Sequence, residues 1–223
     1  AQARMGMKPE AHEAFFRDML ADVDEPTAPF GLLDVRGDGS QLQEARLTIE
    51  TGLARRLREQ ARALGISAAS LFHLAWAAVM SRTSGRDDVV FGTVLFGRMQ
   101  GGEGAERVLG MFINTLPLRV RLAQGSVLEQ AREVQIRLAS LLRHEHAPLN
   151  LAQRCSGVQA PAPLFSALLN YRHSQAEAPA DSAIAWPGID ILSSGEERTN
   201  YPIVLSVDDL GEGFSLSAQT LPS

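Results

Sequence analysis

The two segments that organise this chain read VVFGTVLFGRMQGG at residues 89–102 and LGMFINTLP at residues 109–117. The first is a β-branched and aromatic run interrupted by glycines, which predicts a strand that another backbone or a ligand can approach closely. The second places Asn114 and Thr115 on an apolar segment just before Pro117. Because buried polar side chains need hydrogen-bond partners, this pair is either a structural device or part of a site.

The composition is that of an ordinary globular domain. The 223 residues are 45% hydrophobic and 21% charged, enough for one good core. A net charge of −5, with basic and acidic residues well mixed, argues against a nucleic-acid-binding face. The lone Cys155 fits a reducing cytosol, and no apolar run approaches the ~20 residues that span a bilayer. We therefore expect a cytoplasmic protein with no nucleic acid or membrane among its partners.

The first part of the chain alternates helical periodicity with turn signals. Residues 1–9 are expected to be a flexible end or a remnant of cloning, and the apolar spacing over 10–23 predicts an amphipathic helix. The segment 22–41 is rich in proline and glycine, and its length favours a crossing between two lobes. Partial alternation over 42–50 predicts a strand.

Two helices are expected next. Thr51 is predicted to cap a helix over 52–64. Ser67 is predicted to cap the helix 67–84, which is apolar on nearly every side and should therefore lie buried in the core. His73 in this helix is interpreted as a hydrogen-bonded histidine of a helix interface rather than a catalytic one.

The second part of the chain is expected to complete a sheet. Clean alternation predicts a half-buried strand over 116–122, with Arg119 and Arg121 on its outer face. Ser126 is expected to begin a long helix that runs to about His146. Further predicted elements are a short helix at 149–155, strands at 165–171, 203–208 and 214–219, and loops at 157–163 and 174–187. This order predicts one α/β domain whose helices pack on a mixed sheet.

Simple binding and catalytic motifs fail on their spacing. Gly92 and Gly97 have the gap of a phosphate loop, but Arg98 stands where that loop requires a lysine. His144 and His146 are two residues apart on a predicted helix, so their side chains point in different directions, unlike the i and i+4 pair of a zinc helix. They are interpreted as histidines that interact favourably with a helix C-terminus. No G-x-S-x-G nucleophile elbow is present.

Four motifs in the same order carry a family resemblance. Residues 109–119 resemble the G-x-F-[VI]-N-T-x-x-x-R motif of condensation domains in nonribosomal peptide synthetases, and residues 91–98 resemble their F-G-x-x-x-x-G-R segment. Residues 144–149 are similar to the H-x-x-x-P-[FL] motif, and residues 163–170 to the P-L-F-x-x-x-x-N strand. The likeness runs through almost the whole chain.

The resemblance implies an α/β fold like that of chloramphenicol acetyltransferase, in which two lobes surround a tunnel. The catalytic H-H-x-x-x-D-G motif of this family belongs to the N-terminal lobe. None of the five histidines in this chain is adjacent to another. We therefore expect residues 10–223 to be a C-terminal lobe, a mixed sheet with packed long helices, that is inactive alone. The connector 22–41 would then lie at the crossover between lobes.

The resemblance also implies a chemistry, in which an aminoacyl group on one carrier protein attacks the acyl or peptidyl thioester on another. The expected partners are the N-terminal lobe, donor and acceptor carrier proteins and an adenylation domain. No cofactor is expected to bind directly, but the 4′-phosphopantetheine arms of the carriers would enter the tunnel. With no catalytic residue and no metal ligand in this chain, the predicted tunnel residues are Gly92, Thr93, Gly97, Arg98, Phe112, Asn114, Thr115 and Asn170.

Several alternatives stay open at this point. Asn114 could serve only to tie two strands together. The chain could be a lobe of an epimerisation domain, which shares the fold, although the intact F-I-N-T segment favours condensation. The connector at Pro26 and the segments 170–172 and 197–202 resemble the dual condensation/epimerisation subgroup. A non-catalytic domain that docks carrier proteins is the alternative from another class.

Overall fold

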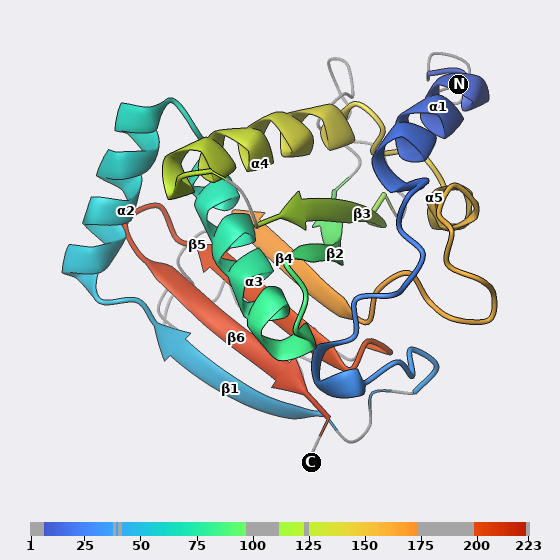
Figure 1. Ribbon diagram of the computed structural model, residues 1–223. Coiled ribbons are helices and arrows are strands. Elements are labelled where there is room, and N and C mark those ends of the chain that lie inside the picture. Colours follow the sequence, from blue (N-terminus) through green and yellow to red (C-terminus); the bar gives the residue numbers. More distant parts are fainter. Residues whose placement is uncertain are drawn as a thin grey trace, which may run out of the picture.

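The computed structural model describes residues 7–37, 39, 42–96, 112–122, 125–173 and 199–221. A six-stranded mixed sheet forms its centre, with strand order β1-β6-β5-β4-β2-β3 (Figure 1). The strands are β1 (Gln43–Thr48), β2 (Asp88–Leu95), β3 (Asn114–Arg121), β4 (Ala167–His173), β5 (Ile203–Asp209) and β6 (Phe214–Thr220). The predicted α/β fold with a mixed sheet is therefore confirmed, and each predicted strand is present.

The strands that pair in parallel are the ones with buried, apolar sequences. β4 pairs in parallel with β2 and with β5, and these strands carry the near-continuous apolar runs typical of strands covered on both faces. The pairing between β2 and β4 is short, with only Gly92 opposite Leu168 and Thr93 opposite Leu169. The edge strand β1 is exposed along its whole length and carries Glu44 and Arg46, charges that discourage further strand pairing.

Helices α2 (Thr51–Leu64), α3 (Ala68–Ser84) and α4 (Val127–Leu142) lie on one face of the sheet (Figure 1). The Phe72 ring of α3 packs against Phe214 and Tyr171, with ring centroids 4.8 Å and 5.9 Å away. Helices α1 (Pro9–Leu20) and α5 (Leu149–Arg154) pack together beside β3 (Figure 1). A one-turn helix, η2 (Pro29–Gly31), interrupts the connector after α1.

Local capping chemistry sets most helix boundaries. The Ser67 side chain accepts a hydrogen bond from the Ser70 amide, as predicted. Ser126 and Glu129 form a reciprocal capping box at the start of α4. The predicted cap at Thr51 is wrong by one residue, because the Glu50 side chain accepts from the Gly52 amide.

Three sequence predictions need correction. Helix α3 is not buried all round, since Val79 is 46% exposed on its outer side. Helix α4 ends at Leu142, so His144 and His146 lie in the turns that follow it rather than in its last turn. Arg119, expected on the outer face of β3, is only 3% exposed. The loop predicted at 174–187 lies outside the described residues.

No single helix in the described segments has the length and apolar character to cross a membrane. The pair α2 and α3 satisfies the criteria of length and composition only when the two are taken together, and they meet at a bend of 107°.

Gly92 gives a direct test of the packing within the sheet. A Cβ atom at this position would lie 2.2 Å from Leu168 Cδ2, 2.5 Å from Phe165 Cε2 and 2.9 Å from Thr115 Cγ2. Three side chains would have to move together, so Gly92→Ala should lower the free energy of unfolding by about 1–3 kcal/mol. Urea denaturation measures this loss.

Gly213→Ala is the matched control. An added Cβ there meets nothing within 4 Å, and the residue does not have a positive φ. We expect this variant to be as stable as the wild type or slightly more stable. Equal effects of the two substitutions would show that the space at Gly92 is not filled as described.

Candidate functional site

The candidate site lies on the face of the sheet opposite α3. Successive residues of a strand point to opposite faces, so Gly92 and Thr93 are on different sides of β2. Leu168, Phe165 and the Thr115 methyl group fill the space beside Gly92. The absent side chain therefore makes room for these three neighbours, where the sequence had suggested room for a substrate.

Thr93 belongs to the other side of the sheet. Its hydroxyl lies 2.8 Å from Nε2 of His73, whose Nδ1 lies 2.7 Å from the Ala69 carbonyl oxygen. Burial lowers the pKa of His73 to about 4, so the ring is neutral and both its nitrogens are used. His73 is hydrogen-bonded as interpreted, but it lies between α3 and strand β2 rather than between helices. Thr93 is its partner and lies apart from the other predicted site residues.

Asn114 ties the start of β3 to the turn after α4. Its Nδ2 group donates to the carbonyl oxygens of Glu145, at 2.8 Å, and Ala147, at 2.7 Å. Its Oδ1 accepts from the backbone amide of Thr115 at 2.9 Å. Both amide hydrogens are thus occupied, and only the second lone pair of Oδ1 remains for another partner. This arrangement matches the structural alternative for Asn114 and joins two of the family-like motifs, 109–119 and 144–149.

Thr115 and Asn170 are half-buried polar residues of the candidate face. Thr115 pairs with Val94 in the register of β2 and β3, two residues beyond Gly92. Asn170 follows Leu169, the last residue of β4 that pairs with β2. Its Oδ1 atom is buried and has no hydrogen-bond partner within the described residues. An unsatisfied buried carbonyl costs stability, which makes this atom a candidate for binding a ligand.

The polar character of this face continues across the sheet. Ser206 of β5 is paired with Asn170, and Ser217 of β6 is paired with Ser206. Phe112 is half-buried just before β3. Gly97 and Arg98, which were also predicted to line the site, lie outside the described residues. The structure therefore brings Gly92, Thr115 and Asn170 together on one face.

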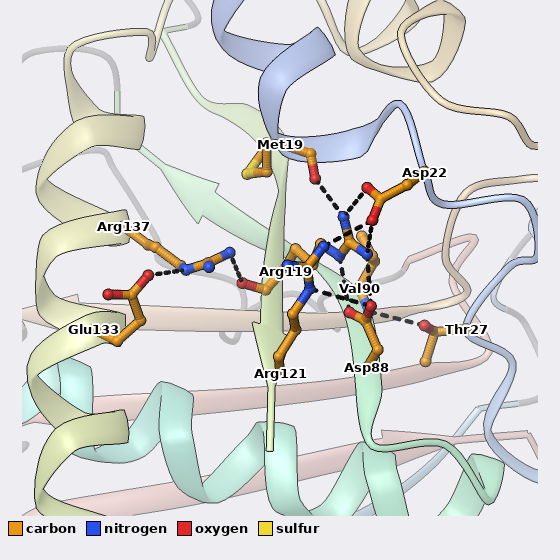
Figure 2. Close-up of polar contacts among 9 residues, drawn as sticks. All are labelled: Met19, Asp22, Thr27, Asp88, Val90, Arg119, Arg121, Glu133 and Arg137. Carbon is orange, nitrogen blue, oxygen red and sulfur yellow. Dashed lines mark hydrogen bonds and ion pairs between the residues drawn. The ribbon is translucent and has the colours of Figure 1, made fainter. Parts of the chain in front are cut away.

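The feature that the sequence did not predict is the buried Arg119 (Figure 2). Its guanidinium donates to both carboxylate oxygens of Asp88, at 2.8 Å and 2.6 Å, and to both of Asp22, at 2.5 Å and 3.1 Å. It also donates to the Met19 carbonyl oxygen at 2.8 Å. One side chain of β3 thereby holds the C-terminal end of α1 and the first residues of the connector (Figure 2).

The Arg119 guanidinium lowers the pKa values of both acids. The hydrogen bond from Arg119 lowers the pKa of Asp22 to about 2. Burial alone would raise the pKa of Asp88, but its bonds with Arg119 outweigh burial and leave the pKa lowered. Both carboxylates are charged at neutral pH. Nearby, Arg137 of α4 donates to the Arg119 carbonyl oxygen at 3.1 Å and covers the free edge of β3 (Figure 2).

The sequence contains a weak signal for this cluster. Arg119 stands in the G-x-F-[VI]-N-T-x-x-x-R motif, but alternation alone assigns it to the outer face of its strand. That face is covered, because α1 and the connector lie over it. The partners Asp88 and Asp22 are 31 and 97 residues away in the chain, too far for any local pattern to reveal.

The described surface has two further features, a hollow between two helices and an exposed histidine. A hollow of about 400 Å³ lies between α1 and α4, lined by Phe15, Met19 and Ile136 among others. The His146 side chain is 51% exposed, and its Nε2 lies 3.7 Å from a Glu145 carboxylate oxygen. Within the described segments, His, Cys, Asp and Glu side chains form no group of three or more that could hold a metal ion.

Comparison with known proteins decides the family. The family model described as "Condensation domain" matches residues 2–220. The chain belongs to the condensation-domain family. It is 54% identical over 99% of its length to malpibaldin synthetase of Mortierella alpina and 52% identical over 99% to malpinin synthetase of the same organism. It is also 32% identical over 86% of its length to a linear gramicidin synthase of Brevibacillus parabrevis.

These relatives are far longer than this condensation-domain chain, which spans only 4%, 3% and 4% of their respective lengths. Solved structures share its fold. The first condensation domain of the CDA synthetase superposes with a TM-score of 0.73 at 19% identity, covering 100% of this chain and 48% of that one. The X-domain from teicoplanin biosynthesis gives 0.73 at 20% identity, covering 95% and 49%.

The Arg119 cluster predicts an asymmetry between its members. The double variant Asp22→Asn/Asp88→Asn leaves a buried cation without a counterion, which should cost about 3–5 kcal/mol of unfolding free energy. Arg119→Met should cost less, because the side chains of Asp22 and Asp88 are 63% and 39% exposed and can be solvated. Urea denaturation at neutral pH compares the two.

Arg121→Met is the matched control, since Arg121 contacts the same two acids from a side chain that is 52% exposed. Its loss should change stability by no more than about 1 kcal/mol. A larger effect of Arg119→Met than of the double asparagine variant would contradict this account.

Proposed function

We propose that this chain is the C-terminal lobe of a condensation domain that forms peptide bonds in nonribosomal peptide synthesis. Three observations support the proposal. The family model matches almost the whole chain. The solved condensation domain of the CDA synthetase is about twice as long, since this chain covers 48% of it. The sequence contains no pair of adjacent histidines.

The proposed reaction joins two carrier-bound substrates. The amine of the acceptor aminoacyl group attacks the thioester carbonyl carbon of the donor, a C–N bond forms and the C–S bond breaks. The donor carrier leaves as its phosphopantetheine thiol, which receives the proton that the amine loses. A histidine of the preceding lobe would position or deprotonate the amine. This lobe would supply the opposite wall of the tunnel and hold no catalytic residue of its own.

The single observation that carries the residue assignments is the unsatisfied Oδ1 of Asn170 on the same face as Thr115. In the proposal these two side chains face the tunnel and offer hydrogen bonds to the amide groups of the pantetheine arm or of the peptide. Asn114 shapes that wall indirectly, because its amide hydrogens are committed to the Glu145 and Ala147 carbonyl groups. Gly97, Arg98 and Phe112 keep their proposed place in the tunnel through the family motifs alone.

The proposed partners follow from the reaction. The donor and acceptor are carrier proteins, and their 4′-phosphopantetheine arms are the cofactors that enter the tunnel. The other half of the tunnel is the N-terminal lobe, and an adenylation domain loads the acceptor carrier. The dual condensation/epimerisation subgroup remains a proposal that rests on the connector and on residues 170–172 and 197–202.

Asn170→Leu tests the tunnel assignment in a protein that also carries the preceding lobe. Leucine is close in size and has no polar atom to leave unsatisfied, so stability should be unchanged or higher. If Oδ1 binds substrate, kcat/KM for condensation should fall by about tenfold or more, equivalent to about 1.4 kcal/mol of transition-state stabilisation. Turnover of loaded carrier proteins and thermal denaturation are measured together.

Asn150→Leu is the control for the same chemical change at an exposed position of α5. It should leave condensation unchanged. Loss of stability without loss of turnover in Asn170→Leu would assign Asn170 a structural role only.

The chain by itself should form no peptide bond from loaded carrier proteins, because the proposal places the histidine in the preceding lobe. Mass spectrometry of the carriers measures the product, and the same lobe covalently joined to its N-terminal counterpart is the positive control. Clear turnover by the isolated chain would contradict the proposed half-domain. Binding of carriers by the joined protein without turnover would favour the docking alternative.

A further inference from the structure

Two buried histidines join α1 to the turn that follows α4. The Nδ1 atoms of His12 and His144 lie 2.9 Å apart, although 132 positions separate the residues in the chain. The residues are only 9% and 6% exposed. A hydrogen bond between two ring nitrogens needs one N–H donor and one lone pair, so at least one ring must be neutral with its proton on Nε2.

The surroundings oppose positive charge on this pair. The Phe15 ring stacks on His144 with centroids 4.0 Å apart, and Phe16 meets it edge-on. Burial, followed by the neighbouring His12 and Arg143, lowers the pKa of His144 to about 4. Burial, followed by the charge of His146, lowers the pKa of His12.

Other titratable groups lie on the elements packed around the pair. From α1, Glu13 forms an ion pair with Arg17. From the turn, the buried Glu145 carboxylate lies 3.7 Å from Nε2 of His146. At the end of α5, the Cys155 thiol lies 3.7 Å from the Glu13 carbonyl oxygen, and burial raises its pKa.

The turn that carries His144 also holds Asn114. The His144 amide donates to the Leu141 carbonyl oxygen and the Ala147 amide to the His144 carbonyl oxygen, each at 2.8 Å. The Asn114 amide group then donates to the Glu145 and Ala147 carbonyl oxygens. One turn of four residues therefore contacts α1 on one side and the start of β3 on the other.

We propose that His12 and His144 form a proton-sensitive lock that positions Asn114, and through it Thr115, in the tunnel wall. Neutral rings fix the turn, and the turn holds the Asn114 side chain. Protonating both rings would place two cations 2.9 Å apart in apolar surroundings. The value of the lock for condensation rests on the proposed function, whereas its existence does not.

The direction of the pH dependence follows from the lowered pKa values. The pKa of a histidine is 6.5 in the unfolded chain, and that of His144 in the folded chain is about 4. Between these pH values the unfolded chain therefore binds more protons than the folded chain. The lock is fully formed above about pH 6.5 and is lost as the pH falls toward about 4. His12 and His144 are positioning residues in this scheme, because neither contacts the reacting atoms.

Amide exchange of the Asn114 side chain tests the lock on the chain alone, without any assay of condensation. In a ¹⁵N-labelled sample, its protection relative to a free asparagine amide at the same pH should fall at least about tenfold between about pH 7 and about pH 4.5. The Gln130 side-chain amide is the internal control. It donates to the Leu122 carbonyl oxygen at 2.9 Å, at the opposite end of α4, and should keep its protection.

Two variants isolate the histidine pair. His12→Phe/His144→Phe keeps aromatic rings beside Phe15 and Phe16 and removes both titratable imidazole groups. The protection of the Asn114 amide should then no longer fall between about pH 7 and about pH 4.5. His73 is unchanged in this variant, so any contribution of His73 to acid sensitivity remains in both proteins. If the double variant fails to fold, His12→Gln replaces it. Because this variant keeps only one of the two rings, two cations cannot form at the pair, and the loss of Asn114 protection at low pH should become smaller.

An unchanged pH step in either variant would overturn the lock, as would equal loss of protection at Asn114 and Gln130. In a protein with the preceding lobe, kcat should fall more steeply with decreasing pH in the wild type than in the double phenylalanine variant, because the histidine of the preceding lobe titrates in both proteins. If exchange follows the pair but kcat does not, the lock stands and the proposed role of Asn114 in condensation fails.

Discussion

A buried guanidinium holds together two distant parts of this molecule. Arg119 can lie in the interior only because Asp22, Asp88 and the Met19 carbonyl group satisfy its donors. Burying an unpaired charge would cost far more than any single packing contact contributes. The end of α1 must therefore lie beside β2 and β3. With α1 in this position, His12 lies within hydrogen-bond distance of His144, in the turn that follows α4.

The pleat of the sheet then divides the polar residues between two roles. Thr93 faces α3 and completes the hydrogen bonds of His73, while its neighbour Gly92 faces the other side. On that other side, Thr115 and Asn170 are half-buried and Asn170 carries an unsatisfied oxygen. Because strand period is two, a shift of one residue would exchange these roles completely. The packing of Leu168 and Phe165 against Gly92 helps to hold the register.

The elements of the fold were largely predictable because their signals are local. Alternation, apolar β-branched runs and helical spacing located all six strands and the long helices, and Ser67 and Ser126 capped the helices as expected. The errors have a common cause in tertiary contacts. Arg119 was assigned to solvent because alternation does not reveal that α1 covers that face. Helix α4 was extended past Leu142 because the buried contacts of His144 cannot be read from its own neighbours. Of the predicted site, Gly92, Thr115 and Asn170 share a face, whereas Thr93 does not.

By itself, the sequence determined the family motifs, the succession of strands and helices along the chain, and the positions of most caps. These features depend on residues within a few positions of one another. Only the tertiary structure decided which polar side chains form hydrogen bonds and ion pairs within the described residues. Thr93 meets His73 across 20 residues, Arg119 meets Asp22 across 97, and His144 meets His12 across 132. Hydrogen bonds and ion pairs act over about 3 Å in space whatever the separation along the chain, so their partners exist only once the chain has folded.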